Sequence, residues 1–422
     1  MLDIKFIREN IDAVKDSCYK RGVKCDIDGL LNIDGKRIKV MTRVENISAE
    51  KNRASKEITK ADEKGKNKII AQMKKIDKKG DKLKEELKEI EEKFNQLMLT
   101  IPNVILDGVP AGKDDTENVI LEKVGKPTEF DFEPKDYMRL ARSLDLIDVE
   151  RAAKVSGSRF GYLKREAVLL EFALVNFTFE TLVKKGFIPV VPPVIIKPEM
   201  AWAMGYLEQT NKDEAYHLGQ DDLYLTATSE QTIGGMMAGE ILKESELPIR
   251  YAGFSTCFRR EAGSYGKDTK GILRVHQFDK IEMFSFVKSE DSKDEHKMLL
   301  ETERELMDAL KLSYQVVHIC SGDLGAPAAE KFDIETWLPS ENKYRETHST
   351  SNCADFQARR LNVRYQKKEG KTEFVHTLNG TAFAIGRILI MIMENYQQED
   401  GSIKVPDVLQ KYTGFSEIKC RL

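Results

Sequence analysis

Nine residues between Ile69 and Leu97 follow a strict alternation of four- and three-residue steps. They are apolar except for one glycine, and they read Ile69, Met73, Ile76, Gly80, Leu83, Leu87, Ile90, Phe94 and Leu97. This heptad spacing puts all nine on one stripe of an α-helix, and such a stripe must be covered by another helix. The pattern therefore predicts one half of an antiparallel two-stranded coiled coil.

The partner helix is expected immediately before it, from about Asp34, as the N-cap, to Lys64. Its inner side would carry Ile38, Met41, Val44, Ile47, Ala54, Ile58 and Ala61. The chain would reverse at Gly65 and Asn67, and two helices of about 30 residues would reach roughly 45 Å. Because small residues replace large ones in the outer seam, we expect the tip to be mobile.

The predicted hairpin is basic in its outer half. Residues 51–84 contain thirteen Lys or Arg and five Asp or Glu, a net charge of +8, which leaves −11 for the other residues because the whole chain has −3. A basic projection on an acidic body indicates a polyanionic partner. A charged coiled coil is also typical of a solvated spacer or a dimerisation zipper, and that alternative stays open at this point.

The remaining composition indicates a globular chain of two domains with 41% hydrophobic residues. Residues 1 to about 30 predict one short amphipathic helix and a loop.

The six cysteines, at positions 18, 25, 257, 320, 353 and 420, have no C-x-x-C spacing, so we expect neither a zinc site nor a disulfide framework. A reduced cytoplasm is the natural setting. The start MLDIKFIREN predicts no secretory signal, and the apolar run 388–393 is too short for a bilayer.

The stretch FRREAGSYGKDTKGILRVHQFDKIEMF, residues 258–284, predicts a strand, a mobile loop and a second strand. In the second strand a period of two puts these side chains on one face: Arg274, His276, Phe278, Lys280 and Glu282. Arg259 and Glu261 share a face of the first strand, and the loop carries Gly263, Gly266, Lys267, Lys270 and Gly271. Buried charges need partners. The stretch therefore favours a cleft for an anionic ligand with a flat ring, such as a nucleotide, over a sheet edge with charges in water.

Five further segments carry local signals. A helix is predicted over Glu166–Lys184, followed by the apolar strand PVVPPVII, 189–196, whose prolines belong at a sheet edge. LYLTATSEQ, 223–231, predicts a strand with Thr226, Thr228 and Glu230 on one face. A polar amphipathic helix is expected over Ser292–Lys311. Residues 382–396 predict a buried helix in which Arg387 needs a carboxylate or phosphate partner.

These segments resemble the class II aminoacyl-tRNA synthetases, and the form FR-x-EAG…R-x-HQF-x-K-x-E is similar to the second motif of seryl-tRNA synthetases. KNRASKEI, 51–58, resembles the arm of that family, IPNVILDGVPAGKDDTENV its linker, ETHSTSNCADFQARR its ATP segment and TLNGTAFAIGRILIMIMENYQ the third motif. The resemblance implies an α+β fold. A tRNA-binding domain, 1–103, would carry the hairpin at about 34–99, with a linker at 104–127. A class II catalytic domain, 128–422, would have a mainly antiparallel sheet flanked by helices.

The resemblance also implies which residues bind which substrate. ATP would meet Arg259, Arg260, Glu261, Arg274, Val275, Phe278, Glu346, Thr347, His348, Ser349 and Arg387. Serine would meet Thr228, Ser229, Glu230, Arg259, Glu282, Asn379 and Thr381, where Thr381 replaces the usual Ser. Glu346 and Ser349 would hold Mg²⁺, and Arg259, Arg387 and Glu346 would be catalytic. His348 stands where the family commonly has a small residue and receives no ligand role.

The implied reaction is ATP-dependent charging of tRNA(Ser) with L-serine through seryl-adenylate, in a cytoplasmic homodimer without a membrane segment. The first motif, the helix 166–184 and its strand, would form the dimer interface. The tRNA would meet Lys51, Arg53, Lys56, Lys74, Lys75, Lys78 and Lys79 through phosphate and shape. Two alternatives remain: a paralogue that loads an amino acid onto a carrier protein, and a catalytically dead RNA-binding protein. The arm disfavours the first, and the intact Arg and Glu residues disfavour the second.

Overall fold

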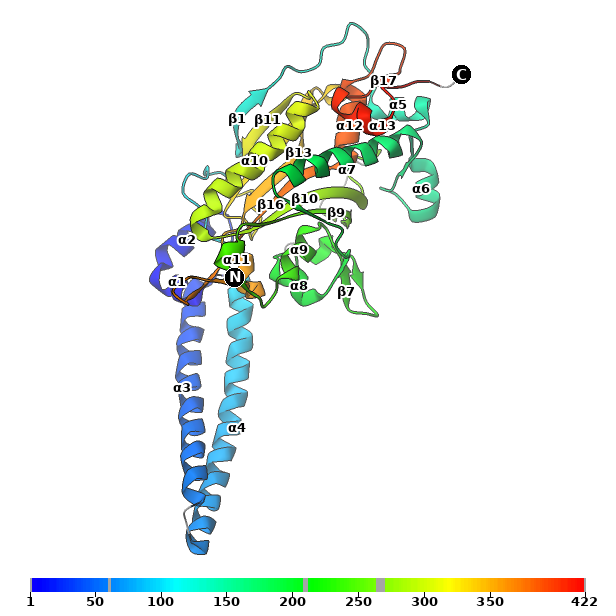
Figure 1. The fold of residues 1–422 in the computed structure, drawn as a ribbon. Coiled ribbons are helices and arrows are strands. Elements are labelled where there is room, and N and C mark those ends of the chain that lie inside the picture. The colour runs from blue at the N-terminus through cyan, green and yellow to red at the C-terminus, as the bar shows by residue number, and fades with distance from the viewer. Residues whose placement is uncertain (1, 60–61, 208–211, 263–269, 421–422) are drawn as a thin grey trace. The chain divides into compact units, whose positions relative to one another are not determined.

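The computed structural model describes residues 2–59, 62–207, 212–262 and 270–420. The chain divides into two compact units, Met1–Pro102 and Asn103–Leu422. The first unit is built from helices alone in its described residues: α1 (Ile4–Glu9), α2 (Ile11–Lys20), α3 (Ile27–Ile58) and α4 (Glu63–Leu99). Figure 1 shows α3 and α4 running side by side in opposite directions. The antiparallel hairpin predicted from the heptad spacing is confirmed.

The seam of the hairpin follows the predicted stripe of α4. Val40, Ile47 and Leu83 form its buried cluster, and Ile76, Leu87 and Ile90 pack against it half-buried. Gly80 has a packing role in this seam, since a Cβ atom there would lie 3.2 Å from Cγ2 of Ile47. Glycine therefore lets the two helix backbones approach closely at this level.

The prediction for the start of α3 was wrong. The helix begins at Ile27, and the Asp26 side chain caps it by accepting a hydrogen bond of 2.9 Å from the Gly29 N–H. Asp34 instead lies inside the helix and is buried, with 1% of its surface exposed. Its carboxylate accepts hydrogen bonds from the guanidinium groups of Arg8 in α1 and Arg37. A buried carboxylate is stable here because two cations neutralise it.

The chain also reverses earlier than predicted. α3 ends at Ile58, and Asp62 caps α4 by accepting a hydrogen bond of 2.9 Å from the Gly65 N–H, which leaves Gly65 and Asn67 inside the helix. The cap overrides the turn preference of these two residues. Ile38, predicted to face inward, is exposed, and Val40 takes the inner position. Ala61 of the predicted seam lies outside the described residues.

The N-terminal segment forms two helices where one was predicted. Asn10, with a φ of −134°, separates α1 from α2 and follows the first as its C-cap. Ile7 and Val14 are both buried, as their helical spacing predicted. The apolar residues are thus buried as predicted although the helix is interrupted, because both short helices turn their apolar sides inward.

An eight-stranded sheet forms the centre of the second unit. Its order is β1-β11-β12-β13-β16-β10-β9-β4, and every neighbouring pair is antiparallel except β4 and β9. The bounds are β1 (Val119–Val124), β11 (Tyr314–His318), β12 (Glu330–Leu338), β13 (Lys343–Asn352), β16 (His376–Ala384), β10 (Gln277–Val287), β9 (Ile249–Phe258) and β4 (Ile188–Val190). The predicted mainly antiparallel sheet with flanking helices is confirmed.

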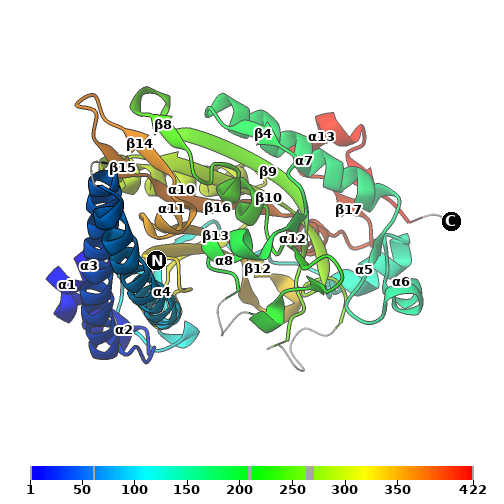
Figure 2. The ribbon, with the colours of Figure 1, turned by 90° about the horizontal axis from the view of Figure 1, so that it is seen from below.

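Helices cover both faces of this sheet. The main core packs α7 (Glu166–Lys184), α10 (Ser292–Ala309) and α12 (Ile385–Asn395) on one face, together with α5 (Tyr137–Leu144). Figure 2 shows α7 along β4 and β9, with α13 (Asp407–Thr413) beside it. A second core joins α8 (Pro198–Ala203), α9 (Glu230–Met236) and α11 (Phe356–Leu361) to the other face. The remaining helix, α6 (Val149–Ser156), lies at the surface.

Ten short strands lie outside the central sheet in the described residues. They pair as β2 (Ile147–Asp148) with β3 (Tyr162–Leu163), β5 (Ile195–Ile196) and β6 (His217–Leu218) with β7 (Leu223–Leu225), β8 (Ile241–Lys243) and β15 (Thr372–Phe374) with β14 (Arg364–Gln366), and β17 (Ile403–Lys404) with β18 (Glu417–Ile418). The strand predicted over 223–231 is therefore wrong beyond Leu225, because Glu230 begins α9. The predicted linker 104–127 includes β1, an edge strand of the central sheet.

The sheet explains the prolines of the 189–196 segment. β4 pairs on one side only, with β9, so the missing N–H of Pro189 leaves no ladder unsatisfied. α7 has the predicted bounds, and Gly186 with a φ of +84° follows its C-cap Lys185. None of the described helices combines the length and the apolarity required to cross a membrane.

Ile47 and Ile38 provide a matched test of the hairpin seam, because both are isoleucines of α3 with 8% and 37% exposure. We expect Ile47→Ala to destabilise the hairpin by about 2 to 4 kcal/mol, since it leaves a cavity. Ile38→Ala should cost less than about 1 kcal/mol, since water already reaches this side chain. Native-state hydrogen exchange of the α3 and α4 amides measures both values. Equal losses at the two positions would contradict the observed seam.

Candidate active site

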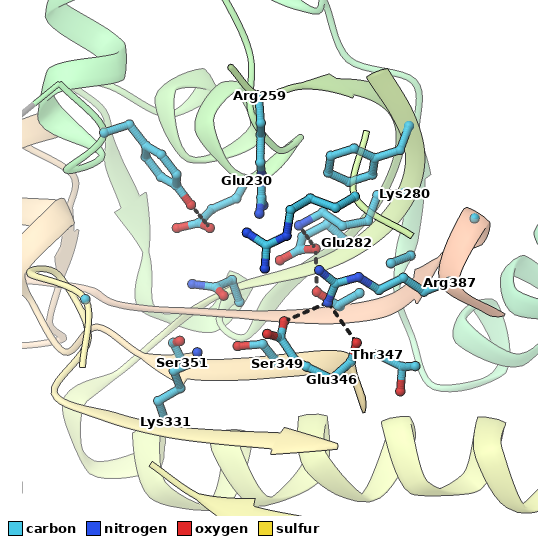
Figure 3. Close-up of a pocket in the computed structure, with 18 of the residues that line it drawn as sticks. Glu230, Arg259, Lys280, Glu282, Lys331, Glu346, Thr347, Ser349, Ser351 and Arg387 are labelled. Carbon is cyan, nitrogen blue, oxygen red and sulfur yellow. Dashed lines mark hydrogen bonds and ion pairs between the residues drawn. The ribbon is translucent and has the colours of Figure 1, made fainter. Parts of the chain in front are cut away.

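A polar cavity of about 380 Å³ opens on the sheet face that also carries α8, α9 and α11. Among the described residues that line it are five cations and four carboxylates: Arg259, Arg274, Lys280, Lys331, Arg387, Glu230, Glu261, Glu282 and Glu346. Figure 3 shows many of these side chains converging from different strands and helices. Such a density of opposite charges suits a ligand that is itself charged at several points.

β10 places the central part of this set. Phe278, Lys280 and Glu282 line the cavity, and Phe284 and Phe286 continue the same face of the strand into the second core. The intervening Ile281 belongs to the main core on the opposite face. The period of two thus gives β10 one face that is charged at one end and apolar at the other.

The predicted alternation was wrong before Gln277, where β10 begins. Arg274 reaches the cavity from the segment ahead of the strand. His276 lies elsewhere: its Nδ1 is 3.0 Å from the carbonyl oxygen of Arg259, and its ring packs near Phe160 and Tyr216. The regular pairing of β10 with β9 ends at Gln277 and Phe258, and the His276 N–H donates instead to the Arg159 carbonyl at 3.0 Å, so the strand alternation does not extend to these side chains.

Arg259 and Glu261 follow β9 and line the cavity together. The Arg259 guanidinium lies 5.3 Å from the Phe278 ring centroid, and Glu261 Oε2 lies 3.1 Å from Nη1 of Arg274. Arg260 is exposed and is not among the lining residues. An aromatic ring beside an arginine offers a surface on which a flat ring can stack.

The loop between the two strands is anchored where the structure describes it. Gly271 has a φ of +73°, and a Cβ atom there would lie only 1.9 Å from the hydroxyl of Tyr137, so this position requires glycine. That hydroxyl accepts a hydrogen bond from the Ile272 N–H and donates one to the Lys270 carbonyl. Gly263, Gly266 and Lys267 lie outside the described residues.

Arg387 finds its partner in Glu346, 41 residues away in sequence. Its Nη1 lies 2.8 Å from the carbonyl oxygen and 3.2 Å from Oε1 of Glu346, as Figure 3 shows. Burial alone would raise the pKa of Glu346, but the charges of Arg387, Lys331 and Arg259 outweigh it and hold this pKa at about 2. Although about half of its side chain faces the open cavity, the carboxylate is therefore ionised throughout the neutral range.

Glu346 and Ser349 both line the cavity from β13 and present a carboxylate and a hydroxyl. No group of three or more His, Cys, Asp or Glu among the described residues could hold a metal ion. Mg²⁺ typically takes one or two carboxylates and fills its other positions with water and substrate phosphates. These two side chains therefore fit a magnesium ion that arrives with a phosphorylated ligand.

Lys331 was not singled out in the sequence. It lies on β12, lines the cavity, and its Nζ is 3.2 Å from Oδ2 of Asp333. Asp333 pairs with Ser349 across β12 and β13, and burial raises its pKa to about 7. The EKFDIETW segment alternates charged and apolar residues, so strand periodicity could have indicated Lys331.

A second set of side chains lies around two buried carboxyls. Glu230 accepts hydrogen bonds from the hydroxyl of Tyr206 at 2.7 Å and from Nε2 of Gln357 at 2.9 Å. Burial raises the pKa of Glu230, and the nearby charge of Glu282 adds to the rise. Nothing in the local sequence indicated Tyr206 or Gln357, because the three residues come from separate segments.

Glu282 is held from two sides. The Lys280 ammonium lies 2.6 Å from its Oε2, and the hydroxyl of Thr381 donates to the same oxygen at 3.2 Å. Asn379 and Thr381 line the cavity from β16, which pairs with β10. The carboxylate is thus fixed in position while part of the cavity surface around it offers amide and hydroxyl groups.

Thr228 and Ser229 are buried and are not among the lining residues. The Thr228 hydroxyl accepts a hydrogen bond of 3.3 Å from the Glu230 N–H, and the Ser229 hydroxyl donates to the Gly253 carbonyl at 3.2 Å. They fix the first turn of α9 against β9. Their geometry positions Glu230 and does not present their own hydroxyls to the cavity.

Of the remaining predicted residues, two line the cavity and one does not. Val275 and Thr347 line the cavity. His348 is 1% exposed, and its Nδ1 lies 2.8 Å from the Thr347 hydroxyl while its ring packs edge-on against Phe383. Burial lowers its pKa to about 3, so the imidazole is neutral. His348 is placed to orient Thr347 and is not a lining residue.

Comparisons with known proteins address the same two units. Residues 1–105 match the model of the seryl-tRNA synthetase N-terminal domain, and residues 214–396 match the class II tRNA synthetase core domain (G, H, P, S and T). The serine–tRNA ligase of Dictyoglomus turgidum is 44% identical over 422 residues, which cover 99% of each chain. This chain belongs to the seryl-tRNA synthetase family.

Solved structures of seryl-tRNA synthetases agree with this assignment. The enzyme from Pyrococcus horikoshii complexed with ATP has a TM-score of 0.91 and 39% identity, covering 100% of both chains. The cytoplasmic serine–tRNA ligase of Naegleria fowleri in complex with AMP has a TM-score of 0.87 and 34% identity, covering 100% of this chain and 99% of that one. The similarity therefore extends over both units of this seryl-tRNA synthetase family member.

One buried carboxyl of this synthetase fold was not predicted. Glu303 of α10 is fully buried, and neither of its oxygens has a hydrogen-bond partner among the described residues. It lies behind β16, where a Cβ atom at Gly380 would be 3.1 Å from Oε1. Burial raises the pKa of Glu303 well above its ordinary value, and the charges of Glu282 and Asp333 add to this effect. The surroundings of Glu303 therefore favour its neutral form over its charged form.

Replacing Glu303 by glutamine should change how stability depends on pH. The folded-state pKa lies above the ordinary 4.5, so the folded state keeps a proton that the unfolded state has lost. The contribution of Glu303 to stability is therefore full below the unfolded-state pKa and falls as pH rises, by up to about 1.4 kcal/mol per pH unit. Denaturant unfolding at several pH values should give a Glu303→Gln variant that gains on the wild type as pH increases.

Glu301 on the same helix supplies the control, because its side chain is 52% exposed and water solvates the carboxylate. Glu301→Gln should follow the wild-type pH dependence. A constant difference between Glu303→Gln and the wild type across the whole pH range would contradict a buried proton at Glu303.

Proposed function

We propose that this chain is a serine–tRNA ligase that activates L-serine with ATP and transfers it from seryl-adenylate to tRNA(Ser). One observation carries the proposal: a single cavity joins an arginine-rich side with a stacking ring to a side with fixed carboxyls. The arginine-rich side suits a nucleoside triphosphate, and the side with the fixed carboxyls suits a small zwitterion. Family membership and the ATP and AMP complexes of its relatives support this assignment.

The nucleotide would lie on the side of Phe278. Adenine would stack on this ring, with Arg387 covering its other face and Glu261 accepting a hydrogen bond from the exocyclic amino group. Glu261 already accepts from Arg274, at 3.1 Å, so its position is fixed before the nucleotide arrives. Arg274 and Arg387 would hold the triphosphate, which requires forked cations that stay charged at every relevant pH.

Arg259 would act between the two substrates. It lies over the Phe278 edge of the cavity and beside Ala227, whose carbonyl accepts a bond of 3.4 Å from Nε. From there it would bind the α-phosphate and the serine carboxylate together. The carboxylate is already ionised, so the activating step needs no strong base. It needs alignment of the attacking oxygen and cations that stabilise charge at the phosphorus.

Mg²⁺ would be held by Glu346 and Ser349, and would supply charge neutralisation between phosphate oxygens. The low pKa of Glu346, about 2, keeps this ligand ionised. Arg387 shares the same carboxylate and would connect the ion site to the phosphate site. Lys331 adds a further cation on the same wall of the cavity.

Serine would lie on the carboxyl side. Glu230 would hold its ammonium group, and the bonds from Tyr206 and Gln357 fix this carboxyl in place. Glu282, Asn379 and Thr381 would read the side-chain hydroxyl. Alanine would leave buried polar groups unpaired, which is a large penalty, whereas threonine differs by one methyl group worth about 1 to 3 kcal/mol and must be excluded by shape.

The helical hairpin would bind the tRNA. Arg53, Lys56, Lys74, Lys75, Lys78 and Lys79 are exposed on α3 and α4, which suits contacts with phosphates. Lys51 lies 2.5 Å from Asp77 across the hairpin, so it also links the two helices. The excess of basic over acidic residues lies in the outer half of the hairpin. A helical spacer would not require positive charge there.

The first motif would form a homodimer interface. Six large apolar side chains of α7 and the following segment are exposed by 45% or more: Leu169, Phe172, Val183, Ile188, Val191 and Ile195. Exposed apolar groups of this density on a helix and an edge strand favour a self-complementary contact. Charging of tRNA serves translation, and the proposal therefore places the chain in the cytoplasm, where its six free cysteines would stay reduced.

Exchange of pyrophosphate into ATP tests the proposed reaction. The purified chain should catalyse this exchange with L-serine and Mg²⁺, and should do so far more slowly with alanine or threonine, for the reasons given above. Charging of tRNA(Ser), followed on an acid gel, tests the second step. Faster exchange with another amino acid, or none with serine, would refute the proposal.

Replacement of Lys74, Lys75, Lys78 and Lys79 by alanine tests the hairpin separately. We expect weaker tRNA binding and a shallower dependence of the binding constant on salt, because fewer counterions are released. Exchange with free serine should remain at the wild-type rate. Lys88→Ala with Lys93→Ala is the control, since both lysines are exposed on α4 beyond the basic stretch. An equal loss of exchange and of tRNA binding would argue against this role.

A further inference from the structure

One face of β16 runs from the cavity into the second core. Thr381 and Asn379 line the cavity, and Thr377 precedes them on the same face, because the side chains of a strand alternate. The intervening Leu378 belongs to the main core on the opposite side of the sheet. Thr377 is fully buried and is not a lining residue. Its side chain can therefore affect a ligand only through a neighbour.

The hydroxyl of Thr377 holds the side chain of Gln357. It donates a hydrogen bond of 2.7 Å to Oε1 of Gln357, a buried residue of α11. Nε2 of the same amide donates to Oε1 of Glu230 at 2.9 Å and to the carbonyl oxygen of Met204 at 3.2 Å. The amide oxygen thus meets a donor, and the amide nitrogen meets two acceptors. Only this orientation of the amide satisfies all three neighbours.

The orientation of this amide determines how Glu230 is held. If the amide were turned over, its oxygen would face the Glu230 carboxyl, and a buried acceptor would lose its donor at a considerable cost in free energy. In the observed orientation both oxygens of Glu230 have a donor, since the Tyr206 hydroxyl donates to Oε2 at 2.7 Å. The Thr377 hydroxyl therefore acts through Gln357 on the position of the carboxyl.

The same face of β16 also holds the second carboxyl of this part of the cavity. The hydroxyl of Thr381 donates to Oε2 of Glu282 at 3.2 Å. Glu230 and Glu282 face one cavity, as Figure 3 shows. Thr381 contacts its carboxyl directly, whereas Thr377 reaches Glu230 through an amide. One strand face thus fixes both carboxyls on the side of the cavity assigned to serine.

We propose that Thr377 is a positioning residue for amino-acid recognition, which orients Gln357 and through it the Glu230 carboxyl. This inference rests on the proposed function, in which Glu230 holds the ammonium group of serine. That ammonium group takes no part in the reaction, so it would be held equally before and during the chemical step. Loss of the hydroxyl should therefore weaken the binding of serine and leave the chemical step nearly unchanged.

Structural support of the second core is the alternative role for a buried threonine. The backbone of Thr377 already takes part in such support, because its N–H donates to the Ala354 carbonyl at 2.9 Å and its carbonyl accepts from the Cys353 N–H at 3.0 Å. Both bonds remain when only the side chain is changed. A hydroxyl with a purely structural role would affect the binding of both substrates and kcat together.

Thr377→Val tests the hydroxyl, since valine replaces it by a methyl group of similar size. In the exchange assay with the full-length chain, we expect the KM for L-serine to rise about tenfold, because a buried hydrogen bond is lost. The KM for ATP and kcat should stay within about twofold of the wild-type values. Thr377→Ser keeps the hydroxyl and should restore the wild-type KM for serine.

A double-mutant cycle tests whether Thr377 acts through Gln357. Gln357→Leu removes the amide and should also raise the KM for serine. In this background Thr377→Val should add little, because its hydroxyl no longer has an amide to orient. Multiplication of the two separate effects on KM would show that the residues act independently, and would overturn the proposal.

Thr178→Val is the matched control. Thr178 is also fully buried, and its hydroxyl donates to the Leu174 carbonyl at 2.7 Å within α7. This variant should keep the wild-type KM for serine. If thermal unfolding shows that Thr377→Val does not fold, Thr377→Ala also lacks the hydroxyl and must show the same rise that is specific to serine.

Two results would refute the role of Thr377 while leaving the proposed reaction intact. They are a wild-type KM for serine in Thr377→Val, and an equal change in kcat and in both KM values. The wild-type chain in the same assay tests the reaction itself. Absence of its exchange with serine would refute the ligase function, and the role of Thr377 with it.

Discussion

Pairing of charges inside the cavity is the constraint on which the second unit depends. Its acidic and basic side chains come from α9, β10, β12, β13 and α12 and from the segments that follow β9 and precede β10. An unpaired charge at such depth would destabilise the fold. Lys280 holds Glu282, and Arg387 holds Glu346. Each pair also leaves further donor or acceptor positions that face the cavity. The arrangement that keeps these charges paired is therefore also the arrangement that suits the cavity to a charged ligand.

The strand β10 connects this site to the core. Its odd-numbered residues, such as Ile281 and Met283, enter the main core, while the opposite face carries Glu282 and then Phe284. The position of Glu282 is thus fixed by apolar packing on both sides of the sheet. Behind it, Glu303 fills the space beside Gly380, and burial there raises the pKa of its carboxyl well above the ordinary value.

Sequence reasoning reached much of the fold and part of the site because these features are local. The heptad stripe of α4, the bounds of α7 and the pocket face of β10 from Phe278 to Glu282 follow from periodicity and caps, which act within a few residues. The errors arose where two local signals favoured different helix boundaries. Asp26 and Asp62 cap the hairpin helices in place of the expected Asp34 and the turn at Gly65, since a side-chain acceptor outweighs a weak turn preference.

The sequence by itself determined that this chain has a long helical hairpin, a basic outer arm and the residue types of a nucleotide and amino-acid site. Only the tertiary structure decided which of these residues meet. Gln357 reaches Glu230 across 127 positions in the sequence. Periodicity specifies the face on which a side chain lies. Its partner is specified by strand order and helix packing, which join segments that no local pattern connects.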